Sequence, residues 1–179
     1  ILYKQAKICD VSLGDRDRAI GVYEQIVELG LDAPAVAALE RLYTASSRWG
    51  DLVELHEREL GVDETTLDRR ATLYHALGRV FEKELAEPER AFEAWGEALR
   101  VDPTHEATVQ SLEQIVAQRA NGDRAQAARA AEMLEGVYLT RLDWRKVMGA
   151  VEARLEGSED PGERRELLRR LAKLHEEPE

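Results

Sequence analysis

The chain has 179 residues, of which 44% are apolar, so it is long enough for a continuous core and too apolar for a disordered protein. Its formal net charge of −11 argues against a nucleic-acid partner, because phosphate binding depends on Lys and Arg. No apolar run reaches the ~18 residues of a membrane span and the first residues do not form a signal peptide, so we expect no membrane insertion.

Apolar residues recur at helical spacing along nearly the whole chain, and no stretch alternates with a period of two for more than a few residues. We therefore expect helices and no strand. Glycine, proline and aspartate mark the breaks, as at Gly30 to Pro34 and at Asp102-Pro103. The breaks delimit ten predicted helices, at residues 1–13, 16–29, 34–47, 50–60, 66–85, 88–100, 105–119, 123–141, 143–156 and 161–176. Because the links are short, successive helices should form antiparallel hairpins.

Two internal offsets relate these helices to one another. An offset of 72 residues places Ala19 on Ala91 and Tyr23 on Trp95. An offset of 95 residues pairs Leu39, Glu40, Tyr43, Trp49, Leu60, Arg69 and Arg70 with Leu134, Glu135, Tyr138, Trp144, Leu155, Arg164 and Arg165. The offsets differ by 23 residues, which indicates an extra helix near 105–123. Repetition of this kind is typical of a solenoid, in which each unit buries its apolar face against its neighbours.

One segment carries a recognisable motif. Residues 74–103 contain Tyr74-x2-Leu77-Gly78-x2-Phe81, then Ala91-x3-Trp95, then Pro103. This resembles the tetratricopeptide repeat pattern W-x2-L-G-x2-Y, A-x3-F, P, with one aromatic residue in place of another. Residues 1–33 resemble the pattern less closely, and the hairpins around Tyr43 and Tyr138 depart from it because they lack the pair of small residues.

The resemblance implies an all-α fold, a right-handed α-α superhelix of about five antiparallel hairpins, and a single helical-repeat domain over residues 1–179. Gly78 in mid-helix costs about 1 kcal/mol relative to alanine, so we expect another helix to approach closely there. In the last predicted helix, Leu167, Leu168, Leu171 and Leu174 form two adjoining apolar stripes, of which only one has a neighbour to pack against. We therefore expect a segment of a longer repeat protein, with self-association through exposed terminal helices as a further possibility.

No catalytic, metal or cofactor motif stands out. The single cysteine, Cys9, excludes an intrachain disulfide and is expected to be buried. The histidines lack metal-binding spacing and are expected to be solvated or to face a groove; they are His56, His75, His105 and His175. The recurrence of Trp49, Trp95 and Trp144 favours packing in the core. The basic residues Arg164, Arg165, Arg169, Arg170 and Lys173 are interleaved with Glu163, Glu166 and Glu176, so they indicate an exposed face first and an acidic-partner site second.

The leading functional hypothesis is therefore a non-enzymatic scaffold that binds a peptide or protein on its concave face. The alternative is a structural assembly element that has no separate ligand. The family's groove positions, carried over where the motif is readable, are Tyr3, Lys7, Asp10, Thr72, His75, Arg79, Glu82 and Lys83. The partner, the pathway and the compartment are left open, although a cytoplasmic location is favoured over others.

Overall fold

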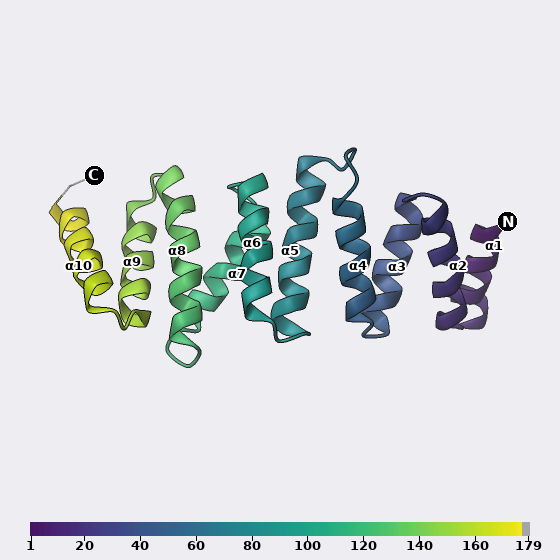
Figure 1. Ribbon diagram of the computed structural model, residues 1–179, viewed down its shortest axis with the longest axis horizontal. Coiled ribbons are helices and arrows are strands. Elements are labelled where there is room, and N and C mark those ends of the chain that lie inside the picture. Colours follow the sequence, from purple (N-terminus) through teal and green to yellow (C-terminus); the bar gives the residue numbers. More distant parts are fainter. Residues whose placement is uncertain (177–179) are drawn as a thin grey trace. The chain divides into compact units, whose positions relative to one another are not determined.

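The computed structural model describes residues 1–176, without the side chain of residue 13, and the described chain is helical throughout with no strand (Figure 1). Its elements are α1 (Leu2–Lys7), the π-helical segment η1 (Ile8–Leu13), α2 (Arg16–Leu29), α3 (Ala33–Ala45), α4 (Trp49–Leu60), α5 (Leu67–Lys83), α6 (Pro88–Val101), α7 (Glu106–Ala117), α8 (Arg124–Thr140), α9 (Trp144–Gly157) and α10 (Pro161–Glu176). The all-α fold class is confirmed, and the ends of the ten predicted helices agree with these bounds to within two residues. Only the first predicted helix differs, because its second half is π-helical.

Aspartate residues explain why four of the helices begin where they do. Asp15, Asp32, Asp123 and Asp143 each precede a helix and accept a hydrogen bond from a backbone N–H of its first turn, at 2.8–3.2 Å. These bonds satisfy backbone donors that have no partner within the helix. Gly14 ends the π-helical segment at a φ of 65°, which glycine adopts without strain.

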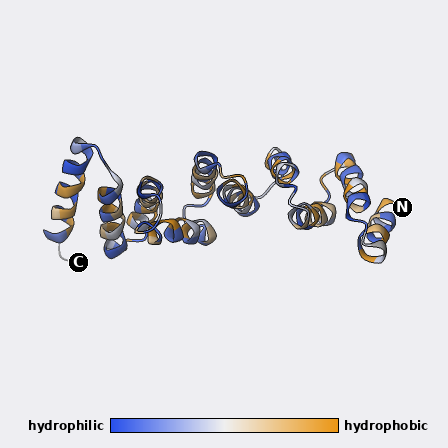
Figure 2. Cartoon of the chain, turned by 90° about the horizontal axis from the view of Figure 1, so that it is seen from below, coloured by the Kyte–Doolittle hydropathy of each residue, from blue (hydrophilic) through white to orange (hydrophobic). Residues whose placement is uncertain are grey.

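The chain forms two compact units, and the boundary between them falls within α5. Unit 1 consists of residues 1–66 and 79–86, and unit 2 consists of residues 67–78 and those from 87 onward. Hydrophobic and hydrophilic residues lie beside one another along the helices (Figure 2), and the buried apolar residues form the core of each unit. The single domain over residues 1–179, the right-handed superhelix and the number of hairpins remain predictions.

In unit 1, helices that follow one another along the chain pack together, as α1 with α2, α2 with α3, and α3 with α4. The largest fully buried side chains there are Ile20, Leu39 and Leu42. Cys9 is buried, as predicted. The helical periodicity of the sequence therefore corresponds to a continuous core in this unit.

In unit 2, α8 packs on both α7 and α9, and α10 packs on α9. Figure 1 shows α7 steeply tilted against α6 and α8, and α6 contacts both of them. This irregularity lies where the two sequence offsets indicate an extra helix. Small residues let α8 and α9 approach closely, since a Cβ atom on Gly157 would lie only 2.7 Å from the Cβ atom of Ala128.

Gly78 and Trp95, both in unit 2, confirm the predicted close approach at the glycine of the motif. A Cβ atom built on Gly78 would lie 2.5 Å from Cδ1 and 2.7 Å from Cε2 of Trp95, a ring that is completely buried. Trp95 therefore has the expected core role. The same prediction is wrong for Trp144, whose side chain is 41% exposed at the first position of α9, and Trp49 is only half-buried.

The leucines of α10 divide as the two-stripe pattern suggests. Leu167 is buried, Leu171 and Leu174 are half-buried, and Leu168 is 54% exposed. Packing of α10 on α9 therefore covers one stripe better than the other.

Candidate binding surfaces

The predicted groove residues of the first helix lie beside α3. The Tyr3 hydroxyl donates a hydrogen bond to the Asp32 carboxylate at the start of α3. Asp10 is half-buried and forms an ion pair with Arg41 of α3. Lys7 is exposed between them. The structure thus brings the polar faces of two first helices of successive predicted hairpins together within unit 1.

The predicted groove residues of α5 are divided between the two units. Thr72 and His75 belong to unit 2, whereas Arg79, Glu82 and Lys83 belong to unit 1. Thr72 is exposed, and its hydroxyl donates to the Asp68 carbonyl oxygen at 2.9 Å. Arg79 and Lys83 are exposed, and Glu82 is half-buried. A single groove formed by all eight predicted residues therefore remains a prediction.

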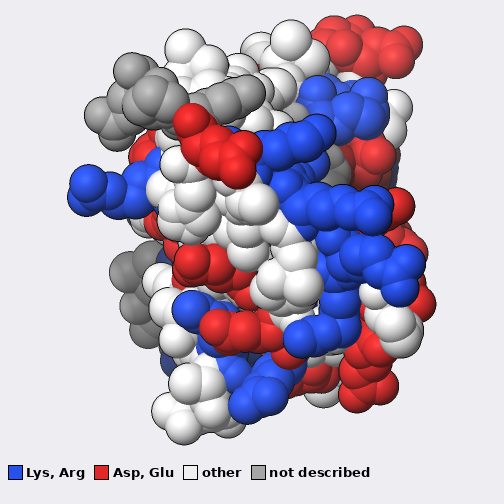
Figure 3. All heavy atoms as spheres, turned by 90° about the vertical axis from the view of Figure 1, so that its left-hand side faces the viewer, with Lys and Arg blue, Asp and Glu red and all other residues white. Residues whose placement is uncertain are grey.

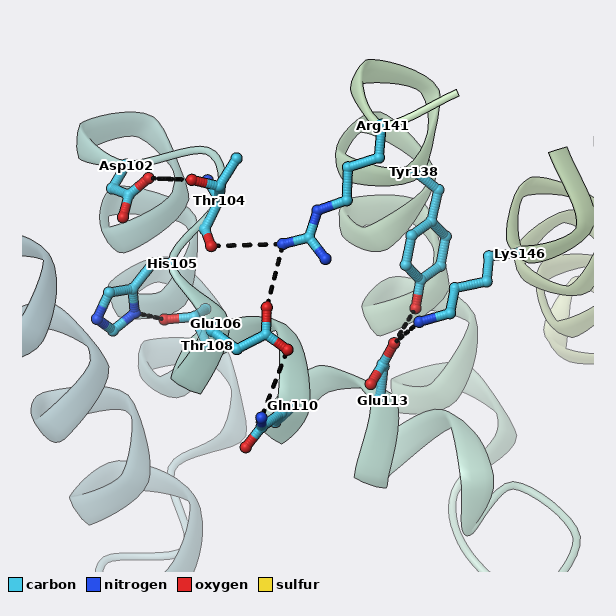
Figure 4. Close-up of polar contacts among 10 residues, drawn as sticks. All are labelled: Asp102, Thr104, His105, Glu106, Thr108, Gln110, Glu113, Tyr138, Arg141 and Lys146. Carbon is cyan, nitrogen blue, oxygen red and sulfur yellow. Dashed lines mark hydrogen bonds and ion pairs between the residues drawn. The ribbon is translucent and has the colours of Figure 1, made fainter. Parts of the chain in front are cut away.

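His75 is half-buried rather than open to solvent. Its ring lies 5.6 Å from that of His105, centroid to centroid, and its Nδ1 atom is 3.4 Å from the hydroxyl oxygen of Thr108. His105 bonds the same hydroxyl through its own Nδ1 atom at 2.8 Å (Figure 4). His75 therefore helps to hold the start of α7.

His56 contradicts the expectation of solvated or groove-facing histidines, because it is only 4% exposed. Its Nε2 atom lies 3.1 Å from Oε1 of Glu40 on α3. The equivalent Glu135 on α8 is also buried and binds Arg154 of α9 at 2.8 Å. In each unit, a glutamate at the same repeat position thus contacts a basic side chain of the following helix. The helical period of the sequence does not predict these contacts.

The basic cluster of α10 has a partly structural role. Arg164 donates to the carbonyl oxygens of Leu155 and Ser158, and Arg170 lies 2.6 Å from the buried Glu135 carboxylate. Seen from the α10 end, Lys and Arg side chains gather on one side next to uncharged residues (Figure 3). Together these contacts tie α10 to α8 and α9.

Two pockets lie outside the predicted groove residues. The first, here called the acidic pocket, is in unit 1 and encloses about 210 Å³ between α2, α3 and α4. Tyr43 in its wall donates to Glu24 at 2.8 Å and has the Arg48 guanidinium 5.1 Å above its ring. Its lining residues are Glu24, Val27, Glu28, Leu39, Tyr43, Asp51, Glu54, Leu55 and Arg58. Four carboxylates therefore face one cation.

The second, here called the basic pocket, is in unit 2 and encloses about 340 Å³ between α7, α8 and α9. The Tyr138 hydroxyl and the Lys146 ammonium both donate to Oε1 of Glu113, at 2.7 and 2.8 Å (Figure 4). Its lining residues are Glu113, Val116, Ala117, Arg119, Ala131, Leu134, Tyr138, Arg145, Lys146, Gly149 and Ala150. Three cations therefore face one carboxylate.

Titration of the Glu113 group follows from these bonds. Burial opposes ionisation of Glu113, but the hydrogen bonds from Lys146 and Tyr138 outweigh it and hold its pKa below the ordinary value. The bond to Glu113 raises the pKa of Lys146. Burial and then the same carboxylate raise the pKa of Tyr138. At neutral pH the group is thus a carboxylate neutralised by an ammonium, beside an un-ionised phenol.

The two pockets occupy equivalent repeat positions, because the 95-residue offset superposes Leu39 and Tyr43 of one on Leu134 and Tyr138 of the other. Their chemistry differs at the remaining positions, where Asp51, Glu54 and Leu55 correspond to Lys146, Gly149 and Ala150. The smaller residues at the last two positions explain the larger volume of the basic pocket. The lysine in place of an aspartate contributes to its opposite charge.

The described residues 1–176 contain no group of three or more His, Cys, Asp or Glu side chains that could hold a metal ion. None of the helices in this part of the chain is both long enough and apolar enough to cross a membrane.

Comparison with known proteins identifies one repeat. Residues 35–70 match the family model of the tetratricopeptide repeat. A search of curated proteins found no match. The matched segment covers most of α3, all of α4 and the first residues of α5, whereas the motif in the sequence lies at residues 74–103. The α3–α4 hairpin lacks the Gly–Ala pair but keeps buried apolar residues at helical spacing, including Leu39, Leu42, Leu52 and Leu55.

Proposed function

We propose that this chain, in which residues 35–70 match the tetratricopeptide repeat family, is a non-enzymatic scaffold that binds a peptide or protein partner on a concave face. Tetratricopeptide repeats generally mediate protein–protein interaction, and the family is typically non-enzymatic. Extended faces of stacked helices suit such binding because many side chains contact the partner at once. The residues proposed to contact it are Tyr3, Lys7, Asp10, Thr72, His75, Arg79, Glu82 and Lys83.

The observation that carries this proposal is the polar face shared by α1 and α3. Tyr3 binds Asp32, and Asp10 binds Arg41, so the two helices hold each other's polar side chains in place. Lys7 is exposed within this face. Side chains ordered before a partner arrives lose less conformational entropy on binding, which supports recognition here.

Affinity capture with charge-reversed variants tests the proposal. The tagged chain is used as bait in a lysate of its source cell, and captured proteins are identified and quantified by mass spectrometry. Lys7→Glu and Arg79→Glu should each reduce capture of the same partner, because both reverse an exposed charge of the proposed face. Arg165→Glu, an exposed reversal on α10, is the matched control. Capture unchanged by Lys7→Glu and Arg79→Glu would reject this face as the binding site.

The exposed Leu168 favours a second function, that of an assembly element that self-associates. Leu168 and the half-buried Leu171 are three residues apart on α10, so they share one face of the helix. Burial of such a face between copies would be favourable by about 25 cal/mol per Å² of apolar surface. Light scattering over a concentration series distinguishes the two functions, because an assembly element should grow in mass with concentration and Leu168→Glu should prevent this growth. A monomer at all concentrations would reject the second function.

A further inference from the structure

We propose that the basic pocket of unit 2 binds a short acidic peptide segment, which inserts one apolar side chain between α7, α8 and α9. This inference rests on the proposed function as a protein-binding module. It concerns a different surface, because none of the eight predicted groove residues lines the basic pocket.

The interior of the basic pocket suits an apolar side chain. Leu134 and Ala131 of α8 and Ala150 of α9 are buried in its wall, and Val116 and Ala117 of α7 complete the apolar lining. Binding sites of this kind combine an apolar interior with a few polar groups at the edge. Gly149 borders open space, because a Cβ atom built on it meets nothing within 4 Å, so a long side chain at this position would extend into the pocket.

The edge of the basic pocket selects for acidic residues on either side of that apolar side chain. Lys146 already neutralises Glu113, and Arg119 lies 2.9 Å from the exposed Glu156. Arg145 is exposed and forms no ion pair with any residue in the described range 1–176. The edge therefore has a positive charge in a chain whose net charge is −11. Complementary charge gives specificity and fast association, so an acidic segment is favoured over a neutral or basic one.

The acidic pocket of unit 1 shows that packing alone does not require this charge. At the equivalent place it has Asp51 and Glu54, and it retains the leucine and the tyrosine of the wall. Both signs of charge are therefore compatible with the same helical framework. Helix packing does not determine the sign of the charge at the edge of the pocket. The positive charge at the edge of the basic pocket is the feature that an acidic ligand would recognise.

Fluorescence anisotropy with defined peptides tests the proposal on the full chain. The probe is a labelled peptide with a central Leu-Phe pair flanked on each side by three Glu or Asp residues. Gly149→Leu should weaken its binding by roughly tenfold or more because the leucine fills the pocket, and Arg145→Glu should weaken it similarly because like charges repel. The matched control is Gly21→Leu, since Gly21 is also the sixth residue of a 14-residue helix and its Cβ also meets nothing within 4 Å.

Two further peptides define the specificity. A peptide with Lys in place of each acidic residue, and a peptide with Ala in place of Leu and Phe, should each bind at least roughly tenfold more weakly than the probe. Circular dichroism should show the same helical content in all variants. Equal binding by Gly149→Leu and the unmodified chain would overturn the proposal, as would no detectable binding of the probe at millimolar protein.

These failures differ from a failure of the proposed function. If the chain captures a partner that depends on Lys7 and Arg79 but does not bind the probe, only the basic pocket is rejected. If the probe binds and Gly149→Leu abolishes its binding, the inference holds even where no partner is captured on the first-helix face.

Discussion

Replacing Gly78 with alanine perturbs the close contact between α5 and α6 that the sequence predicts at this glycine. The new Cβ atom would lie 2.5 Å from Cδ1 and 2.7 Å from Cε2 of Trp95, whereas unbonded carbon atoms pack at about 3.5–4.0 Å. The indole ring would therefore have to withdraw by about 1 Å. Trp95 is completely buried and meets the Phe92 ring edge to face at 5.7 Å between centroids, so it has no open space to enter.

The size of the effect follows from two opposing contributions. Overpacking a core typically costs about 1–3 kcal/mol, whereas removal of glycine from a helix interior stabilises by up to about 1 kcal/mol. Gly21→Ala should show the favourable contribution alone, because its Cβ atom meets nothing within 4 Å. Gly78→Ala should therefore be less stable than Gly21→Ala by about 1–3 kcal/mol. This corresponds to a melting temperature lower by about 2–4 °C for each kcal/mol.

Urea and thermal unfolding, followed by circular dichroism and tryptophan fluorescence, measure this difference. Gly78→Leu should destabilise more than Gly78→Ala because more atoms enter the same space. In a Trp95→Phe background, Gly78→Ala should cost less, since the phenyl ring lacks the Nε1 atom that also faces the new methyl group. If Gly78→Ala stabilised the chain as much as Gly21→Ala does, the close-packing argument would be refuted.

Three further predictions concern unit 2. Arg154→Met should destabilise by about 3 kcal/mol in urea titrations, the lower end of the range for breaking a buried ion pair, because Glu135 stays buried with only one arginine near it. Hydrogen bonds hold the pKa of Glu113 below its ordinary 4.5, so the ionised carboxylate stabilises the fold above that pH, and this contribution is lost as pH falls through the folded-state pKa. Glu113→Gln should therefore lose less stability than the unmodified chain between about pH 5 and pH 2. Plots of unfolding free energy against pH that run parallel for the two proteins would contradict this. Leu167→Ala should lower the free energy of unfolding by about 2–5 kcal/mol because Leu167 is buried. Leu168→Ala should change it by less than about 0.5 kcal/mol because Leu168 is exposed. Comparison of the urea midpoints of the two variants measures this difference.

The sequence alone predicted the helices because their signals are local. Apolar residues three and four apart define the buried face of a helix, and Asp15, Asp32, Asp123 and Asp143 mark helix starts through bonds to backbone donors two or three residues away. The small residue at Gly78 also predicted a close approach, because a glycine in mid-helix is destabilising unless another group needs its space.

Tertiary structure decided the environment of individual side chains. His56 lies in the core with its Nε2 atom 3.1 Å from the carboxylate of Glu40, 16 residues earlier, and Trp144 is exposed although the equivalent Trp49 is half-buried. Neither result follows from helical spacing, because both depend on which helix covers which face. A helical pattern shows that a face is buried without showing what covers it.

The two pockets illustrate the same division. The 95-residue offset was visible in the sequence and related Tyr43 to Tyr138. Only the structure showed that three successive helices surround each tyrosine and leave a space beside it. The size of that space depends on the small residues Gly149 and Ala150. Whether a small residue marks a close contact, as at Gly78, or borders an open space, as at Gly149, depends on the neighbouring helices.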